Sequence, residues 1–139
     1  MKILYILPVL VLLAALAACS EAAPPVAVTV AEICQQAAGT RVVAEGHLAL
    51  PTFMTCTEGQ CQISFYDETD SVFVEFVASD TPGNNGLQMP PDPYTEDNLS
   101  VVLADGTTAD RNTLVRITGP VRKPSDNVCY LDVHTVERQ

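Results

Sequence analysis

The sequence predicts a small, mainly β domain with one N-terminal helix and a long insertion rich in proline and glycine. Three observations support this class. Five segments between residues 42 and 137 alternate apolar and polar side chains, which is the period of a half-buried strand. Only the stretch that begins at Thr29 has apolar residues at helical spacing. Residues 79–98 carry four prolines and two glycines without any regular period.

The chain opens with the layout of an export signal. One positive charge, Lys2, precedes an apolar run, and small residues follow just before a cysteine. The quartet Leu16-Ala17-Ala18-Cys19 resembles the lipobox of bacterial lipoproteins, in which the cysteine thiol is acylated and the peptide bond before it is cut. This resemblance implies that residues 1–18 are a signal peptide and that Cys19 carries the lipid.

The same resemblance implies an address in the cell. Acyl chains on Cys19, palmitate included, would anchor the chain in the membrane of the cell envelope. Ser20 stands where an aspartate retains such proteins in the inner membrane, which favours the outer membrane, facing the periplasm. Two other interpretations stay open. A retained membrane helix would need roughly 20 apolar residues, more than the run from Ile3 to Ala18 provides, and an ordinary secretory peptide would leave Cys19 unmodified.

The rest of the chain has the composition of one compact domain in an oxidising compartment. Cleavage before Cys19 would remove Lys2, so six of the seven basic residues would remain beside all 17 acidic ones. Such an acidic chain is repelled by nucleic-acid phosphates and anionic headgroups, and it attracts basic partners. The four cysteines other than Cys19 form an even set, which predicts two disulfides with three open connectivities.

The N-terminal part is expected to be a tether followed by a helix. Residues 19–28 are rich in alanine and proline and would tether a domain of residues 29–139 to the membrane. Thr29 and Glu32 form a capping-box pattern at the start of the helix. Helical spacing then gives one apolar stripe of Val30, Ile33, Cys34 and Ala37, and the following glycine, Gly39, suits the C-terminal stop.

Five strands are predicted after the helix. The first alternates over residues 42–50, and Gly46 inside it indicates a bulge or a tight bend. The second and third, residues 61–66 and 72–77, are joined by an acidic turn. The fourth covers residues 114–121, a turn is expected at 123–127, and the last strand is expected to run unbroken over 128–137.

The long insertion separates the third and fourth strands. Residues 79–98 are expected to form a flexible loop, either as a plain insertion or as a contact with a partner through its apolar residues Leu87, Met89 and Tyr94. Residues 101–106 beyond it are typical of an accessory hairpin.

A helix followed by five strands, with a glycine inside the first, resembles the OB-fold, a five-stranded Greek-key barrel. The sequence is similar to small exported OB-fold domains of bacteria over Arg41-Val42-Val43-Ala44-Glu45-Gly46 and Val115-Arg116-Ile117-Thr118-Gly119-Pro120-Val121. The resemblance implies binding through the second and third strands and the loops that flank them. Here it implies the binding residues Tyr66, Phe73, Arg122 and Lys123.

Hairpin geometry indicates one disulfide. If Glu58-Gly59 is a two-residue turn, Cys56 lies opposite Cys61 in a pair without ladder hydrogen bonds, the closer kind. Cys34 and Cys129 then remain, and a bridge between them would fasten the helix to the last strand. A redox-active pair is the rival interpretation, although Cys56 and Cys61 lack the two-residue spacing of thioredoxin-type sites.

No catalytic or metal-binding constellation is visible in the sequence. His47 and His134 lie on separate predicted strands, and no nucleophile elbow, phosphate-binding glycine loop or zinc-protease motif occurs. We therefore expect no catalytic residue, no metal ligand and no cofactor.

These observations predict a non-catalytic envelope lipoprotein, held by an acylated Cys19, that binds or assembles with a protein or small-ligand partner. The alternative is a disulfide- or metal-dependent envelope enzyme. A nucleic-acid-binding OB-fold is disfavoured, because it needs a positive groove beside stacking aromatic rings.

Overall fold

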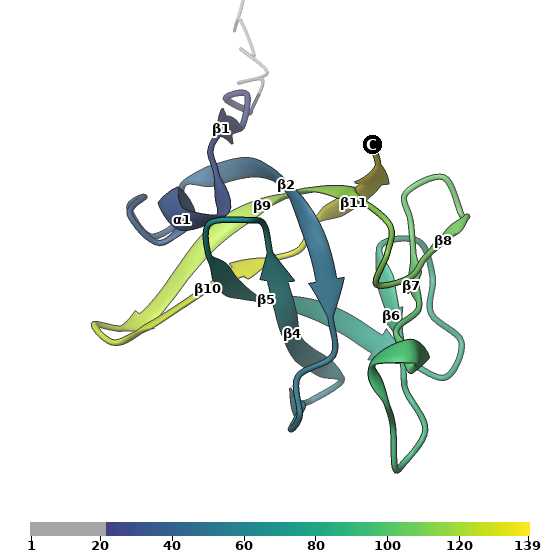
Figure 1. Ribbon diagram of the computed structural model, residues 1–139. Helices are drawn as coiled ribbons and strands as arrows, with labels where there is room; N and C mark the ends of the chain where they lie inside the picture. The colour runs from purple at the N-terminus through teal and green to yellow at the C-terminus, as the bar shows by residue number, and fades with distance from the viewer. Residues whose placement is uncertain (1–21) are drawn as a thin grey trace, which may run out of the picture.

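Five strands close into a barrel in the computed structural model, which describes residues 22–139 (Figure 1). In order around the ring, the strands are β2 (Arg41–Ala49), β4 (Gln60–Tyr66), β5 (Ser71–Ser79), β10 (Val128–Asp132) and β9 (Val115–Ser125). Each neighbouring pair is antiparallel except β5 and β10, which are parallel, and β9 pairs back onto β2. The predicted mainly β, OB-like Greek-key barrel is confirmed.

Gly46 allows β2 to belong to both halves of the ring. β2 pairs with β9 as far as Gly46 and with β4 from His47 onward. A Cβ atom at Gly46 would lie 2.5 Å from the backbone oxygen of Tyr66 and 2.9 Å from the ring of Phe65. The glycine therefore stands at the switch between partner strands, where the sequence predicted a bulge or a bend.

Inward side chains from all five strands fill the barrel. Alternate residues of β2, β4 and β5 are buried, as their period-two pattern predicts. The largest fully buried side chains include Phe65, Phe76, Ile33, Leu48, Ile63, Leu87, Ile117 and Leu131. Ile33 comes from the helix and Leu87 from the insertion, so both segments share one core with the barrel.

The N-terminal segment has less helix and more sheet than expected. β1 (Val26–Ala27) pairs in parallel with β2, so the end of the expected tether belongs to the domain. α1 (Val30–Ile33) begins at the predicted capping box, where the Glu32 carboxylate accepts a hydrogen bond from the backbone N–H of Thr29 at 2.8 Å. The helix ends at Ile33, with Cys34 as its C-cap, and does not reach the predicted glycine, because the N–H groups of Gln35 and Gln36 bond to carbonyls three residues back and tighten the turn.

Two disulfides join the cysteines in the pairs that the sequence indicates. The Cys34–Cys129 bridge connects the end of α1 to β10, across 95 residues of chain. β3 (Thr55–Thr57) and β4 form the predicted hairpin, with the Cys56–Cys61 bridge across it. Both residues of its turn, Glu58-Gly59, have positive φ, 52° and 79°, which is typical of a type I′ turn.

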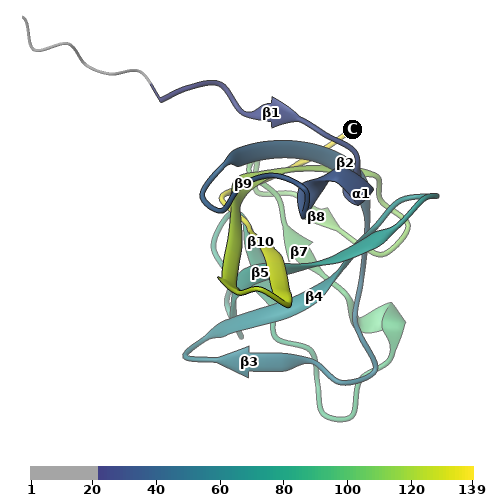
Figure 2. The ribbon, with the colours of Figure 1, turned by 90° about the vertical axis from the view of Figure 1, so that its left-hand side faces the viewer.

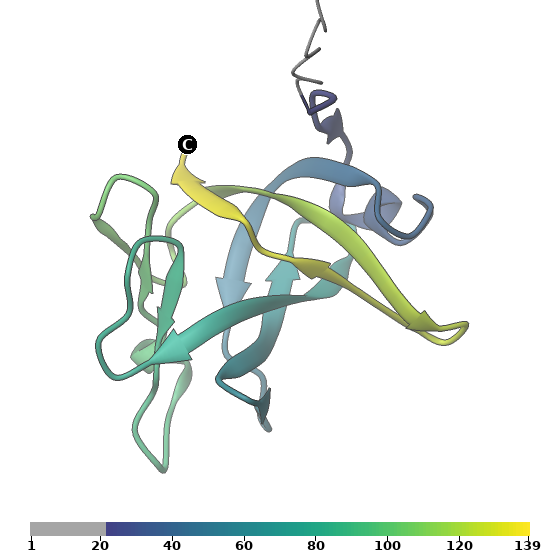
Figure 3. The ribbon, with the colours of Figure 1, turned by 180° about the vertical axis from the view of Figure 1, so that it is seen from behind.

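The segment 79–98, expected as a flexible loop, carries regular structure and packs on the barrel. β6 (Gly86–Gln88) runs parallel to the end of β5, and the 3₁₀ helix η1 (Glu96–Asn98) follows. β7 (Val101–Val102) and β8 (Thr108–Ala109) form the predicted accessory hairpin. Figures 1 and 3 show these elements at the end of the barrel opposite the β9–β10 hairpin. Full burial of Leu87 in the core accounts for the difference, since it ties the segment down despite its prolines.

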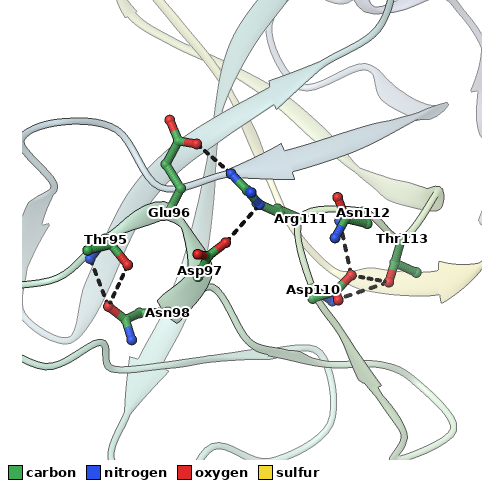
Figure 4. A network of polar contacts seen from close by, with 8 residues as sticks. All are labelled: Thr95, Glu96, Asp97, Asn98, Asp110, Arg111, Asn112 and Thr113. Carbon is green, nitrogen blue, oxygen red and sulfur yellow. Dashed lines mark hydrogen bonds and ion pairs between the residues drawn. The ribbon is translucent and has the colours of Figure 1, made fainter.

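A polar network positions η1 against the loop that follows β8 (Figure 4). The guanidinium of Arg111 pairs with Glu96 at 2.7 Å and with Asp97 at 3.0 Å. Local hydrogen bonds close the two ends of the network, between Thr95 and Asn98 and between Asp110 and Thr113. Exposed pairs of this kind contribute little stability each, and their effect here is to orient the loop.

The final strand is broken, which corrects the unbroken strand predicted over residues 128–137. β10 pairs with the end of β9, and β11 (Thr135–Arg138) pairs with its beginning. At the break, Gly119 of β9 lies so close to the backbone oxygen of Asp132 that no Cβ atom fits. β9 also extends to Ser125, so the turn predicted before β10 is reduced to two residues.

Candidate binding face

The outer surface of β4, β5 and β10 carries the side chains that alternate with the core residues. We call this surface, together with the adjoining arginine of β9, the strand face. Its residues are Gln62, Ser64, Tyr66, Phe73, Glu75, Val77, Tyr130, Asp132 and Arg122. Figure 2, which looks toward the β9–β10 hairpin, shows β10, β5 and β4 side by side.

Apolar side chains on the strand face are open to solvent. Val77 is 65% exposed, Phe73 48% and Tyr66 37%. Phe73 lies directly opposite Tyr130 in the β5–β10 register, and Tyr130 is half-buried. Tyr66 is diagonal to Phe73 across the β4–β5 pair, so Tyr66, Phe73 and Tyr130 are neighbours, and Val77 follows beyond Glu75. Contiguous apolar surface on a monomer marks interaction sites. The strand face is therefore the main candidate for contact with a partner.

Two carboxylates stand side by side in the middle of the strand face. Glu75 and Asp132 are opposite each other in the β5–β10 register. Arg122 neutralises Asp132, because its Nη2 and Nε atoms donate to one carboxylate oxygen at 2.8 and 3.1 Å. Glu75 accepts a hydrogen bond at 3.2 Å from the neutral amide of Gln62, and no basic side chain of residues 22–139 forms an ion pair with it. Glu75 is thus the uncompensated charge of the face.

Tyr130 lies between the aromatic and the acidic parts of the face. Partial burial raises the pKa of Tyr130, and the nearby charges of Glu75 and Asp132 raise it further against the opposing effect of Arg122. The shift keeps the Tyr130 phenol protonated into more alkaline solution than an ordinary tyrosine, so it remains a hydrogen-bond donor there.

The structure brings most of the implied binding residues together. Three of the four lie on the strand face: Tyr66, Phe73 and Arg122. Lys123 follows Arg122 in β9 and is exposed, but alternation along the strand directs its side chain to the opposite side, so it is not a member of the face. The other six members of the strand face were not predicted as binding residues, although alternation along β5 places Glu75 and Val77 on the same side as Phe73. Tyr130 and Asp132 join this surface only through the parallel pairing of β10 with β5, and a single sequence carries no signal for that pairing.

Two shallow hollows border the strand face. One of about 270 Å³ lies beside Tyr130, Arg122 and Lys123. The other, of about 350 Å³, lies beside Val77 and His134. Small-molecule pockets run from about 300 to 1,000 Å³, so the first hollow is below this range and the second is at its lower end, and both have room for a side chain of a partner.

A second apolar surface lies where the loop before β3 meets the insertion. The cleft there has a volume of about 460 Å³, and its Phe53 is 88% exposed. Tyr94 closes the insertion onto the loop, since its hydroxyl donates to the Pro51 carbonyl at 2.7 Å and accepts from the Met54 N–H at 2.9 Å. A further hollow of about 640 Å³ lies beside β1, where Arg116 already forms an ion pair.

The apolar residues of the insertion are used inside the protein. Leu87 is fully buried, and Met89 and Tyr94 pack against the core while partly exposed. A partner contact through this segment would therefore use its cleft and not these three side chains as free anchors.

The two histidines lie apart in the structure. The ring of His47 is 5.8 Å from that of Tyr66 between centroids, and His134 Nε2 is 3.8 Å from a carboxylate oxygen of Asp132. Within residues 22–139, no group of three or more histidine, cysteine, aspartate or glutamate side chains is arranged to hold a metal ion.

Cys19, the predicted lipidation site, and the predicted signal peptide lie outside the described residues. Across the described range, 22–139, helices are too short or too polar to span a bilayer.

Comparison with solved structures agrees with the barrel. The structure is similar to the hypothetical protein YgiW from E. coli, with a TM-score of 0.52 and 16% sequence identity over 82% of this chain and 90% of that one. It also matches the telomere capping protein Ten1 from Saccharomyces pombe, with a TM-score of 0.46 and 14% identity over 83% of this chain and 81% of that one. At such identities the YgiW match shows a shared fold alone. No protein-family model matches the sequence, and no curated protein does.

Proposed function

We propose that this protein is a non-catalytic binding module of the bacterial cell envelope that contacts a protein partner through the strand face. The observation that carries the proposal is the exposure of Tyr66, Phe73 and Val77 on one surface of a closed barrel. Side chains on paired strands are already ordered, so a partner covers their apolar area at a small entropic cost. The hollows at both ends of the face have room for side chains of a polypeptide that lies along it.

The proposal includes export and a lipid anchor. The two disulfides are the pattern of an oxidising compartment, which supports a place outside the cytoplasm. We propose that acylated Cys19 holds the chain to the outer membrane from the periplasmic side and that the residues before β1 act as the tether. Figure 2 shows β1 on the side of the barrel away from β3, so the β3 end of the strand face would point away from the bilayer.

The rival functions have weaker support. An OB-fold that binds single-stranded nucleic acid needs a positive groove beside aromatic rings, whereas the aromatic rings here flank Glu75 and Asp132. A disulfide-dependent enzyme would need a labile Cys56–Cys61 bridge. Alkylation of the native protein without reductant separates the two functions, because labelling of Cys56 or Cys61 would support the enzyme and unlabelled cysteines the binding module.

Photo-crosslinking in intact cells tests the strand face. A photoreactive phenylalanine analogue replaces Phe73 in one full-length chain and Leu114 in another. Leu114 is the matched control, since it is 42% exposed but lies just before β9 and outside the face. We expect a discrete crosslinked protein from position 73 and none from position 114. Equal products from both positions, or none from either, would overturn the proposed face.

Metabolic labelling tests the anchor separately. Radiolabelled palmitate should enter the wild-type chain and not the Cys19→Ser variant. An unlabelled wild-type chain that keeps residues 1–18 would refute the lipid anchor without affecting the crosslinking result.

A further inference from the structure

We infer that the strand face binds a cationic segment of its partner, with a lysine or arginine side chain placed on Glu75. This inference rests on the proposed function and specifies the chemistry of the partner. It follows from one uncompensated charge within an otherwise apolar stretch of β5.

Glu75 cannot be avoided by a partner that covers the apolar residues. It lies between Phe73 and Val77 on the same side of β5, and it is already half-buried. A partner that takes Phe73 and Val77 out of water therefore also removes water from the Glu75 carboxylate. An ionised carboxylate that loses its water without a counter-charge carries a large free-energy penalty.

The protein does not supply that counter-charge itself. The nearest cation of the face, Arg122, lies on β9 with β10 between it and β5, and its Nε and Nη2 atoms donate to Asp132. The hydrogen bond that Glu75 accepts comes from the uncharged amide of Gln62, so it brings no positive charge. The partner must bring the positive charge, and a charge-assisted hydrogen bond to the carboxylate then replaces the lost water.

The surroundings of Glu75 also suit a long basic side chain. The ring of Phe73 is 48% exposed, and Tyr130 lies opposite it in register. Lysine and arginine lay their aliphatic stems along apolar surface and are attracted by aromatic faces. A segment in which basic residues alternate with apolar ones would cover Phe73 and Val77 while neutralising Glu75.

Other occupants fit the charge pattern less well. A second copy of this chain, related by a two-fold axis, would bring a second Glu75 and a second Asp132 onto the same surface. Nucleic acid and anionic headgroups would add negative charge to an uncompensated carboxylate. A cationic polypeptide is the occupant that compensates it.

Two dye-labelled peptides and a matched pair of variants test the inference. One extended peptide alternates valine with lysine, and the other alternates valine with glutamine. Their affinity is measured by fluorescence anisotropy with the full chain, disulfides intact, in a neutral detergent. Glu75→Gln removes the charge of the face while keeping an oxygen for Gln62. Glu137→Gln removes the same charge from an exposed position on β11.

We expect the lysine peptide to bind wild type and Glu137→Gln equally, and Glu75→Gln about tenfold more weakly, the effect of losing one hydrogen bond to a charged group. The glutamine peptide should bind weakly to all three proteins. Added salt should reduce the preference for lysine.

Equal affinity of the two variants for the lysine peptide would overturn the inference, because the attraction would then come from overall acidity. Failure of wild type to bind the lysine peptide would overturn it as well. Crosslinking from position 73 is independent of both results. A crosslinked partner without a lysine preference would keep the docking face and remove the cation.

Discussion

Removal of the Cys34–Cys129 disulfide should destabilise the protein much more than removal of Cys56–Cys61. A disulfide restricts the unfolded chain, and the restriction grows with the length of the loop that it closes. The first bridge spans 95 residues and the second spans 5. The loop-entropy relation then assigns about 4.7 kcal/mol to the first bridge and about 2 kcal/mol to the second.

The local structure increases the contrast. α1 has only four residues, far fewer than an isolated helix needs, so its position depends on packing and on the Cys34–Cys129 bridge. Its two buried side chains, Val30 and Ile33, lose contact with the core if the helix detaches. In the hairpin, β3 pairs with β4 through backbone hydrogen bonds, and we expect this pairing to persist when the Cys56–Cys61 bridge is absent.

Urea and thermal unfolding of C34A/C129A and C56A/C61A, followed by circular dichroism without reductant, measure the two losses. For a domain of this size the melting temperature should fall by roughly 15–20 °C for the first variant and by roughly 6–10 °C for the second. Equal losses, or a larger loss for the hairpin variant, would refute the reasoning from loop length.

Three further predictions concern single side chains. Gly119→Ala should lower the free energy of unfolding in urea by about 3 kcal/mol or more, because the added Cβ atom collides with the backbone of Asp132. The control Gly83→Ala, whose added Cβ atom lies in open space, should change it by less than about 0.5 kcal/mol. Similar values for the two variants would contradict this prediction. Hydrogen bonds from the hydroxyl and backbone N–H of Thr69 lower the pKa of Asp67 from 3.8 to about 2, so the carboxylate stabilises the fold above that range and loses this effect as the pH falls through it. The stability advantage of wild type over Asp67→Asn should therefore shrink from pH 3.8 to about pH 2, and a constant advantage in urea titrations would count against it. Tyr94→Phe should cost about 1–2 kcal/mol in the same assay through two lost hydrogen bonds, and an unchanged midpoint would show that they contribute nothing.

The strands of the barrel could be predicted because their signal is local. Alternation over residues 42–50 is the pattern of burial that β2 shows, and a glycine inside it marks the bend. The hairpin around Glu58-Gly59 placed Cys56 opposite Cys61, and the pairing of the other two cysteines followed by elimination. The strand and hairpin inferences use residues that are close in the sequence, and the Cys34–Cys129 pairing needs in addition only the number of cysteines.

The insertion and the last strand show where local patterns fail. Proline and glycine dominate residues 79–98, yet the burial of Leu87 in the barrel core decides their arrangement. Residues 128–137 alternate as one strand, yet the close approach of Gly119 to Asp132 divides them into β10 and β11. Both outcomes depend on contacts with parts of the chain that are far away in sequence.

The sequence by itself determined the mainly β class, the five strands of the barrel and the disulfide partners, because period and turn chemistry are properties of neighbouring residues and the cysteine count is a property of composition. Only the tertiary structure decided that β5 and β10 lie in parallel, and therefore that Phe73 adjoins Tyr130 and Glu75 adjoins Asp132. The physical reason is that a strand can pair with any other whose face is apolar, and the choice among them is made by closing the ring over a common core.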